Sequence, residues 1–266
     1  MTEKKRKQLL DAPTKGWKAD LPLPQIPPSE PLLAIGLPPN FADDTCLELH
    51  TSRILNRTGA ACCAFGVILC ALMWIFLAFF EIRFKTMAGD PLLAVMVIGG
   101  VIGLPIAGIG MLRTVIAPPR DEPIRFNRKR GKVYLYRFHS GGPLSRKGWG
   151  VVPVVFNWAD LRAEAWSRMA ATTSAPIFAW GVDIAVVEPG TNHVIDRFQL
   201  AGSNANGEHM WAMARAFMNQ GPEALPKYPR PPRDWNNDVP PYHLVLRLAP
   251  KVQWPADMDR ESRTAP

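Results

Sequence analysis

The chain has 266 residues and a formal charge of +8, from 31 lysines and arginines against 23 aspartates and glutamates. Its basic residues crowd into the stretch after a long apolar region, whereas a nucleic-acid binder spreads them over a groove with interleaved aromatic residues, so no nucleic-acid partner is expected. The four cysteines form no C-x-x-C pair and the five histidines are isolated, which argues against a disulfide framework or a local metal motif.

The two ends of the chain are predicted to be extended. Prolines cluster from Leu21 to Asn40 and again from Pro222 to Pro241. Clustered proline without a period is typical of a weakly folded linker. We therefore expect residues 1–57 to be a proline-rich cytoplasmic segment and residues 222–266 to be a proline-rich C-terminal tail.

Two apolar stretches predict a membrane α-helical hairpin over residues 58–116. Thr58–Phe80 and Pro91–Leu112 contain no charged residue, and at about 1.5 Å per residue each can cross a hydrocarbon layer roughly 30 Å thick. The short connection Glu81–Asp90 makes the helices antiparallel, so both termini face one side. Basic residues after the second stretch place that side in the cytoplasm by the positive-inside rule.

Small residues in the second stretch are candidates for helix packing. Gly99 and Gly103 form a G-x-x-x-G pair, which Gly108 extends, and a neighbouring helix can approach such a surface closely. The first apolar stretch is the expected neighbour, and self-association into a homo-oligomer is the alternative. Neither stretch holds an ionisable residue, which argues against a transporter.

Residues 122–221 are predicted to form an α+β soluble domain. The strand candidates are Ile124–Asn127, Lys132–Phe138, Val151–Phe156, Leu161–Trp166, Val182–Val187 and His193–Leu200. Pro153 favours an edge position for its strand. From Gly207 to Gln220 the apolar residues recur on one helical face, and Gly221 ends that helix. This order is typical of a pleckstrin-homology-like domain, an antiparallel bent sheet closed by a C-terminal amphipathic helix.

The sequence shows no catalytic motif. It lacks a P-loop, a dinucleotide fingerprint and a G-x-S-x-G elbow, so we expect no enzyme activity, no catalytic residue and no cofactor. Four tryptophans are expected to fill the core rather than to form a binding site: Trp158, Trp166, Trp180 and Trp211.

A basic turn soon follows the second apolar stretch. Arg128, Lys129 and Arg130, with Arg125 and Lys132 beside them, are candidates to face the bilayer. Each basic group near an anionic surface contributes about 1 kcal/mol, so the turn could orient the domain on anionic lipid. The alternative is a solvated turn whose charge only sets topology.

Short motifs along the chain carry a resemblance to a known family. They are Asp20–Pro24, Pro27–Pro28, Ser52–Arg53, Asn56–Arg57, Phe126–Tyr134, Trp158, Asp196–Phe198 and Gly221–Pro226. With the overall layout, they resemble uncharacterised inner-membrane proteins of Gram-negative bacteria that have two transmembrane helices and a C-terminal soluble domain and are often encoded near type VI secretion effectors. The resemblance implies a multi-pass inner-membrane accessory protein, such as an immunity protein, whose partner is an effector or secretion component.

Two functional hypotheses follow. The first is a non-enzymatic inner-membrane protein that presents a cytoplasmic interaction domain to a protein partner. The alternative is an anionic-lipid-binding, membrane-organising protein that uses the basic turn at residues 128–132. A hydrolase with a dispersed site is disfavoured, because the carboxylates are scattered without a paired motif.

Overall fold

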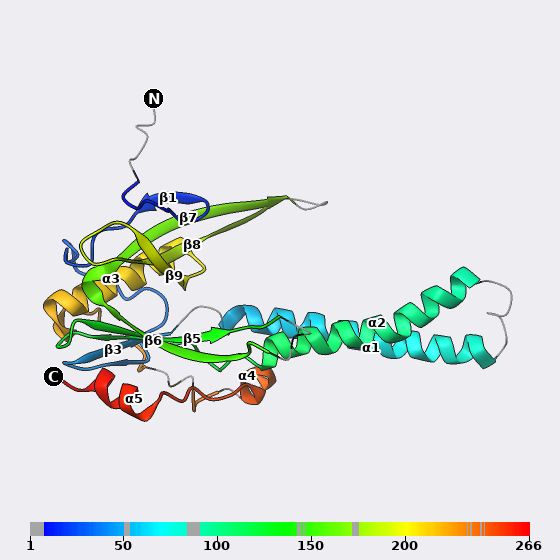
Figure 1. The fold of residues 1–266 in the computed structure, drawn as a ribbon. Helices are drawn as coiled ribbons and strands as arrows, with labels where there is room; N and C mark the ends of the chain where they lie inside the picture. The colour runs from blue at the N-terminus through cyan, green and yellow to red at the C-terminus, as the bar shows by residue number, and fades with distance from the viewer. Residues whose placement is uncertain are drawn as a thin grey trace.

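The computed structural model describes residues 8–50, 54–83, 91–142, 145, 147–171, 176–232, 234, 236–239, 241 and 243–266. The described chain is α+β, with two long apolar helices and two antiparallel sheets. The two helices project together from one end of the part that holds the sheets, and the C-terminus lies at the opposite end (Figure 1).

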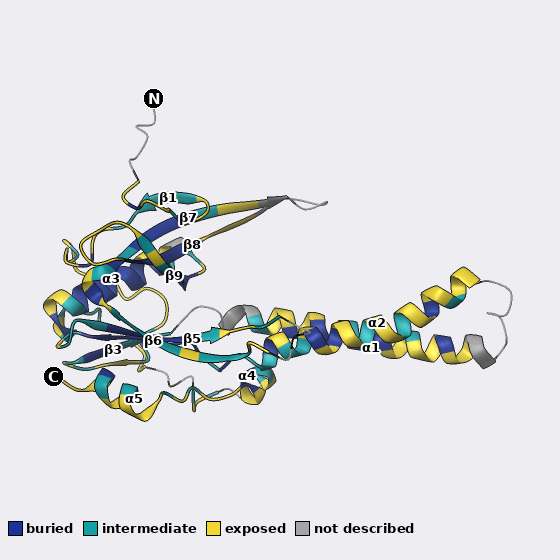
Figure 2. Ribbon diagram, viewed as in Figure 1, coloured by how far each residue is buried: buried dark blue, intermediate teal, exposed yellow. Residues whose placement is uncertain are grey.

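The projecting hairpin consists of α1 (Ile54–Arg83) and α2 (Pro91–Ile116). By length and composition, both helices are long and apolar enough to cross a membrane. The helices predicted over residues 58–80 and 91–112 are therefore confirmed, and both continue beyond the predicted ends. Most of their described side chains are exposed, as the yellow segments of the hairpin in Figure 2 show.

Alanines form the inner face of α1. Its buried residues among those described are Ala61, Ala64, Ala71 and Ala78. Their spacing of three and seven residues places them on one face of the helix. Since small side chains allow two backbones to approach, these alanines explain how α1 packs along α2.

The first sheet has the strand order β1-β7-β8-β9. Its strands are β1 (Trp17–Asp20), β7 (Leu161–Ala171), β8 (Pro176–Val187) and β9 (Val194–Ala201). The second sheet has the order β2-β3-β4-β5-β6. Its strands are β2 (Phe41–Ala42), β3 (Cys46–Leu49), β4 (Ile124–Asn127), β5 (Lys132–His139) and β6 (Gly150–Asn157).

All six predicted strands are present, and the antiparallel arrangement is confirmed. The strand with Pro153 lies at the edge of its sheet, as a residue without a backbone donor requires. Three further strands, β1, β2 and β3, were not predicted and come from the proline-rich segment before the hairpin. These strands have two to four residues each, too few to show a hydrophobic alternation.

The hairpin is inserted between two neighbouring strands. β3 precedes it and β4 follows it, and the two strands pair from Cys46 opposite Asn127 to Leu49 opposite Ile124. The chain therefore leaves the sheet at Leu49 and returns beside it at Ile124. This pairing holds the two ends of the hairpin together, and the sheet domain contains residues from both sides of the hairpin.

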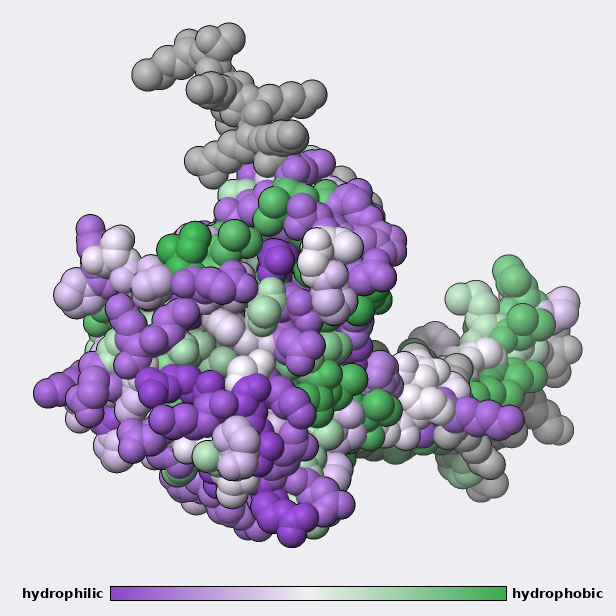
Figure 3. Space-filling view, turned by 60° about the vertical axis from the view of Figure 1, so that its left-hand side comes forward, coloured by the Kyte–Doolittle hydropathy of each residue, from purple (hydrophilic) through white to green (hydrophobic). Residues whose placement is uncertain are grey.

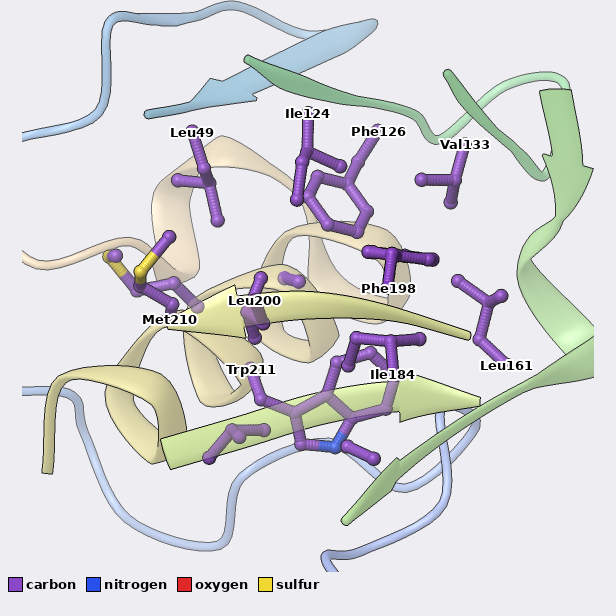
Figure 4. Packing of buried hydrophobic residues seen from close by; sticks show 14 of the residues in the cluster. Leu49, Ile124, Phe126, Val133, Leu161, Ile184, Phe198, Leu200, Met210 and Trp211 are labelled. Carbon is purple, nitrogen blue, oxygen red and sulfur yellow. The ribbon is translucent and has the colours of Figure 1, made fainter. Parts of the chain in front are cut away.

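A helix, α3 (Asn204–Gln220), shares one hydrophobic core with both sheets. Figure 4 shows Phe126 and Val133 from the second sheet facing Ile184 and Leu200 from the first, with Trp211 of the helix among them. The predicted helix over residues 207–220 is confirmed and begins three residues earlier. Gly221 follows it with φ of 96°, a conformation that favours glycine.

Two of the four tryptophans expected in the core, Trp158 and Trp211, are buried there, and Trp166 is buried outside that cluster, where its indole donates to Asp183. The expectation is wrong for Trp180, which is 49% exposed. The reason is its position on β8, outside the part of the strand that β9 covers.

The C-terminal segment carries further helices and packs on the domain. It contains a 3-10 turn (Pro222–Ala224), α4 (Leu244–Leu248) and α5 (Ala256–Arg263). α4 contacts both α1 and α2, and α5 contacts β4 and β5. The prediction of a proline-rich tail did not include these helices or their contacts, because helices this short carry little periodic signal.

Candidate functional site

Arginines join the base of the hairpin to the domain. Arg57 of α1 donates to the carbonyl of Pro118 at 3.3 Å, and Arg113 of α2 donates to the carbonyl of Ser145 at 2.6 Å. The Arg113 guanidinium also lies 4.5 Å from the centre of the Trp149 ring. Guanidinium groups suit this role because they present several donors in a fixed plane.

Arg120 fastens the C-terminal segment to the linker after α2. Its guanidinium donates to the carbonyls of Asn236, Arg247 and Ala249. Asn236 in turn exchanges two hydrogen bonds with the backbone of Val252, at 2.7 and 3.0 Å. Hydrogen bonds to main-chain oxygens therefore fix the position of the Arg120 guanidinium at this end of the hairpin.

Arg125 on β4 is buried rather than directed toward lipid, so the expectation that it faces the bilayer is wrong. Only 3% of its side chain is exposed. It pairs with Glu48 of β3 at 2.5 Å and with Asp259 of α5 at 2.6 Å, and its guanidinium lies 4.5 Å from the centre of the Trp254 ring. Such a buried cation requires close anions.

Two other predicted lipid contacts hold the end of the chain. Arg130 donates to the carbonyls of Thr264 and Ala265 at 3.0 and 2.7 Å, and Lys132 pairs with Glu261 at 2.8 Å. The hydrogen bond from Lys132 lowers the pKa of the Glu261 carboxyl below its ordinary value. These basic residues therefore bind α5 and the residues after it.

The remaining members of the basic turn are Arg128, which is half-buried, and Lys129, which is exposed. The turn joins the end of β4 to the start of β5, and β4 runs away from the linker that follows α2. Because Arg130 contacts the last residues of the chain, the turn lies near the C-terminus, opposite the hairpin in Figure 1. This placement does not bring the turn beside the apolar hairpin.

A polar cavity of about 600 Å³ lies between the second sheet and the C-terminal segment. Its lining includes Asn40, Glu48, Asp121, Arg125 and Trp254. Asn40 donates to both carboxylates, at 3.1 and 3.0 Å, while its own carbonyl oxygen has no hydrogen-bond partner within the described chain. Mixed acidic, amide and guanidinium groups can contact a polar peptide or a small polar molecule.

Opposing effects determine the pKa of Asp259, which lines the cavity. Burial raises the pKa of its carboxyl, but hydrogen bonds and charge from Arg125 and Arg263 outweigh burial and lower the pKa below its ordinary value. Asp259 is therefore an anion at neutral pH and holds α5 against β4. Within the described ranges, no group of three or more His, Cys, Asp or Glu side chains is placed to hold a metal ion.

The glycines expected to pack the hairpin divide between two faces of α2. A Cβ on Gly108 would lie 2.8 Å from Ile68 of α1, so this glycine faces the first helix as predicted. A Cβ on Gly99 or Gly103 would meet nothing within 4 Å. Gly100 instead faces α1, beside the indole of Trp74. The G-x-x-x-G pair therefore lies on the outer surface of the hairpin.

Sequence reasoning missed the acidic partners of the basic stretch: Glu48, Asp259 and Glu261. A local signal was present in α5, where Pro255 precedes a first turn with Asp257 and Asp259 and a last turn with Arg260 and Arg263. This charge order is favourable for a helix because of the helix dipole. The pairing of α5 with β4 has no sequence signal, since it joins residues 134 positions apart.

Comparison with known protein families finds a match for the C-terminal part of the chain. The model of a family of unknown function, DUF6708, matches residues 101–266, from the middle of α2 to the last residue. No curated protein and no solved structure matches the chain. Strands β1–β3 and helix α1 lie outside the matched region.

Proposed function

This chain belongs to the family of unknown function DUF6708, and we propose that it is a membrane-anchored, non-enzymatic protein that presents an α+β interaction domain at the bilayer surface. The observation that carries the proposal is the hairpin, whose two long apolar helices project from the domain with most described side chains exposed. Burial of apolar surface contributes roughly 25 cal/mol per Å², so an apolar hairpin of this length is stable in lipid and not in water.

The hairpin separates polar and apolar surfaces. In Figure 3 the hydrophilic colour predominates on the sheet domain, and hydrophobic residues gather on the outer part of the hairpin. Arg57, Arg113 and Arg120 lie at the domain end. In our proposal this basic end faces the cytoplasm by the positive-inside rule, which makes the chain a multi-pass inner-membrane protein with both termini cytoplasmic.

The domain supplies the interaction surface in this proposal. Two antiparallel sheets that share a core with the helix after the last strand support a pleckstrin-homology-like architecture. The polar cavity beside Arg125 is the candidate contact for a protein partner, because the accessible side chains of Asn237, Asp259 and Arg263 line it and offer amide, carboxylate and guanidinium groups together. The resemblance to proteins encoded near type VI secretion effectors makes an effector or secretion component the proposed partner, and an immunity or accessory role the proposed task.

The observed contacts of the basic turn do not favour its binding to lipid. Arg125 is buried, and Arg130 and Lys132 bind the C-terminal segment. The turn also lies at the end of the domain opposite the hairpin.

Affinity purification of the full chain tests the interaction role. An N-terminal tag leaves the bonds of Thr264 and Ala265 intact, and the protein is purified from native membranes in detergent. We expect a stoichiometric protein partner that is lost in Asn237→Arg, at an exposed residue that lines the cavity, and kept in Lys129→Glu, at an exposed residue outside that lining. Co-purification of anionic lipid without a protein would contradict the proposal.

Co-expression tests the immunity role. Cells that produce a toxin encoded beside this chain should survive when the full chain is present and die when the Asn237→Arg variant replaces it. Absence of protection by the unaltered chain would remove the immunity role and leave the membrane anchor to be judged on its own test.

A further inference from the structure

The paired strands β7 and β8 extend beyond their sheet as a two-stranded ribbon. β9 pairs with β8 only from Val182 onward, and β1 pairs with β7 only as far as Trp166. The backbone N–H of Ser167 still donates to the carbonyl of Gly16, so only residues 168–171 and 176–179 pair with each other alone. At about 3.3 Å per residue, four residues carry the ribbon about 13 Å past the sheet. Figure 1 shows that it points in the same direction as the hairpin.

One face of this ribbon is apolar and uncovered. Met169 lies opposite Phe178, and Ser167 lies opposite Trp180, so all four share a face. Met169 is 67% exposed, Phe178 is 54% exposed and Trp180 is exposed to a similar degree. A two-stranded ribbon is marginally stable in water unless its face packs against something. The structure therefore leaves a surface that needs a cover.

The charged residues of the ribbon do not prevent its apolar face from contacting an apolar environment. Among its described side chains, only Arg168 is charged. Its guanidinium turns back toward the sheet, where it donates to the carbonyl of Lys15 at 2.9 Å and lies 4.1 Å from the centre of the Trp166 ring. It also lies 3.4 Å from the carboxylate of Asp183. Among the described residues, the ribbon face with Met169 and Phe178 carries no charged side chain.

A second apolar surface lies at the base of the hairpin. The short helix α4 contacts both α1 and α2. Its Leu246 is buried, while Leu244 and Leu248 are 66% and 65% exposed. Apolar side chains are thus displayed on the hairpin side of the domain by two elements far apart in the sequence.

We infer that the β7–β8 ribbon is a second membrane contact, in which Met169, Phe178 and Trp180 enter the headgroup region of the leaflet that the hairpin crosses. The inference rests on the proposed function, because the hairpin supplies the bilayer. Aromatic residues suit this depth, since their rings are apolar at one end and tolerate water at the other. With two attachments, the domain has a fixed tilt and presents its cavity at a fixed angle to the membrane.

Fluorescence quenching by brominated lipids tests the contact in the full chain. The four native cysteines are replaced by alanine, and an environment-sensitive thiol probe is attached at Met169→Cys or Phe178→Cys. Cys70, kept alone, marks the hairpin. Ile195→Cys is the matched control, because it is an exposed β-strand position at the other end of the same sheet. Each protein is placed as one copy in a lipid nanodisc.

The expected result is a blue-shifted emission and a loss of intensity with bromines near the headgroup for probes at positions 169 and 178, with no change at 195. Quenching at Cys70 without quenching at 169 and 178 would overturn the ribbon contact and leave the membrane anchor standing. A blue shift at 169 and 178 without lipid quenching would assign the face to a protein and overturn the inference. Absence of quenching at Cys70 would overturn the anchor and the ribbon contact together.

Discussion

Arg125 lies on β4 with carboxylates from two distant segments beside it, Glu48 from β3 and Asp259 from α5. Asn127, two residues later on the same strand, donates through its amide to the carbonyls of Glu261, Ser262 and Thr264 at 2.9 to 3.2 Å. A guanidinium and an amide thus bind the last helix to the sheet. These contacts explain why polar groups are buried on the outer side of β4.

Replacement of Arg125 by methionine tests this junction. Loss of the cation leaves Glu48 and Asp259 facing each other, so we expect the free energy of unfolding to fall by about 3 to 5 kcal/mol. Lys132→Met is the control, since it breaks an exposed pair that is worth less than about 1 kcal/mol. Urea unfolding of the full chain in detergent measures both. Equal losses in the two variants would refute the role of Arg125.

His50 at the end of the second sheet gives a pH dependence. Burial lowers the pKa of its imidazole from 6.5 to about 4. Between these values the unfolded chain binds a proton that the folded chain does not, so stability falls as the pH drops from about 6.5 to about 4, by up to about 1.4 kcal/mol per pH unit.

The variant His50→Gln should flatten that slope, as measured by urea unfolding at several pH values. His139→Gln, at an exposed position, should leave the slope as it is in the unaltered chain. An unchanged slope in His50→Gln would show that other groups cause the acid sensitivity.

At the scale of elements, the hairpin packs through alanines of α1 and two glycines of α2. Gly100→Ala places a methyl group against Trp74, and Gly108→Ala places one against Ile68. Overpacking of this kind costs about 1 to 3 kcal/mol. We expect thermal unfolding in detergent to shift to lower temperature in these two variants and not in Gly99→Ala or Gly103→Ala. The reverse order would mean that α1 packs on the other face of α2.

Elements with a clear period could be predicted from the sequence, and short ones could not. Met210, Trp211, Ala214 and Phe217 repeat on one face, so α3 was predictable. The strands before the hairpin are held by distant partners, such as Trp17 opposite Trp166, and their formation depends on the folded sheet. The candidate site is less predictable still, because its charges come from β3, β4 and α5 and meet only in the fold.

The packing of the hairpin could likewise be predicted only in part from the Gly99 and Gly103 pair. The G-x-x-x-G spacing of Gly99 and Gly103 predicts a packing face but does not specify which helix covers it. In the structure α1 covers Gly100 and Gly108 instead. At the base of the hairpin, Arg113 of α2 contacts the β5–β6 connection, a long-range contact that the glycine spacing does not specify.

For the whole molecule, the insertion of the hairpin between β3 and β4 decides which fragments can fold. A chain that starts at residue 117 lacks Leu47 and Leu49, which are buried in the core, and leaves β4 without β3, one of its two neighbours. We expect it to be insoluble. A chain in which a short Gly/Ser linker replaces residues 54–116 keeps β3 beside β4 and should give a soluble domain.

Gel filtration and near-ultraviolet circular dichroism distinguish the two fragments. A monodisperse, folded protein from residues 117–266 alone would contradict the assignment of β1–β3 to the domain. Aggregation of the linker chain alongside solubility of the shorter fragment would contradict it as well.

Membrane extraction of the full chain is the most direct measurement of the anchor. Isolated membranes are washed at alkaline pH and then treated with detergent, with the linker chain as a matched soluble control. We predict that the full chain stays in the pellet through the wash and is released by detergent, while the linker chain remains in the supernatant. A full chain that is soluble and monodisperse without detergent, with Cys62, Cys63 and Cys70 shielded from a water-soluble thiol reagent, would show that α1 and α2 pack inside a globular protein.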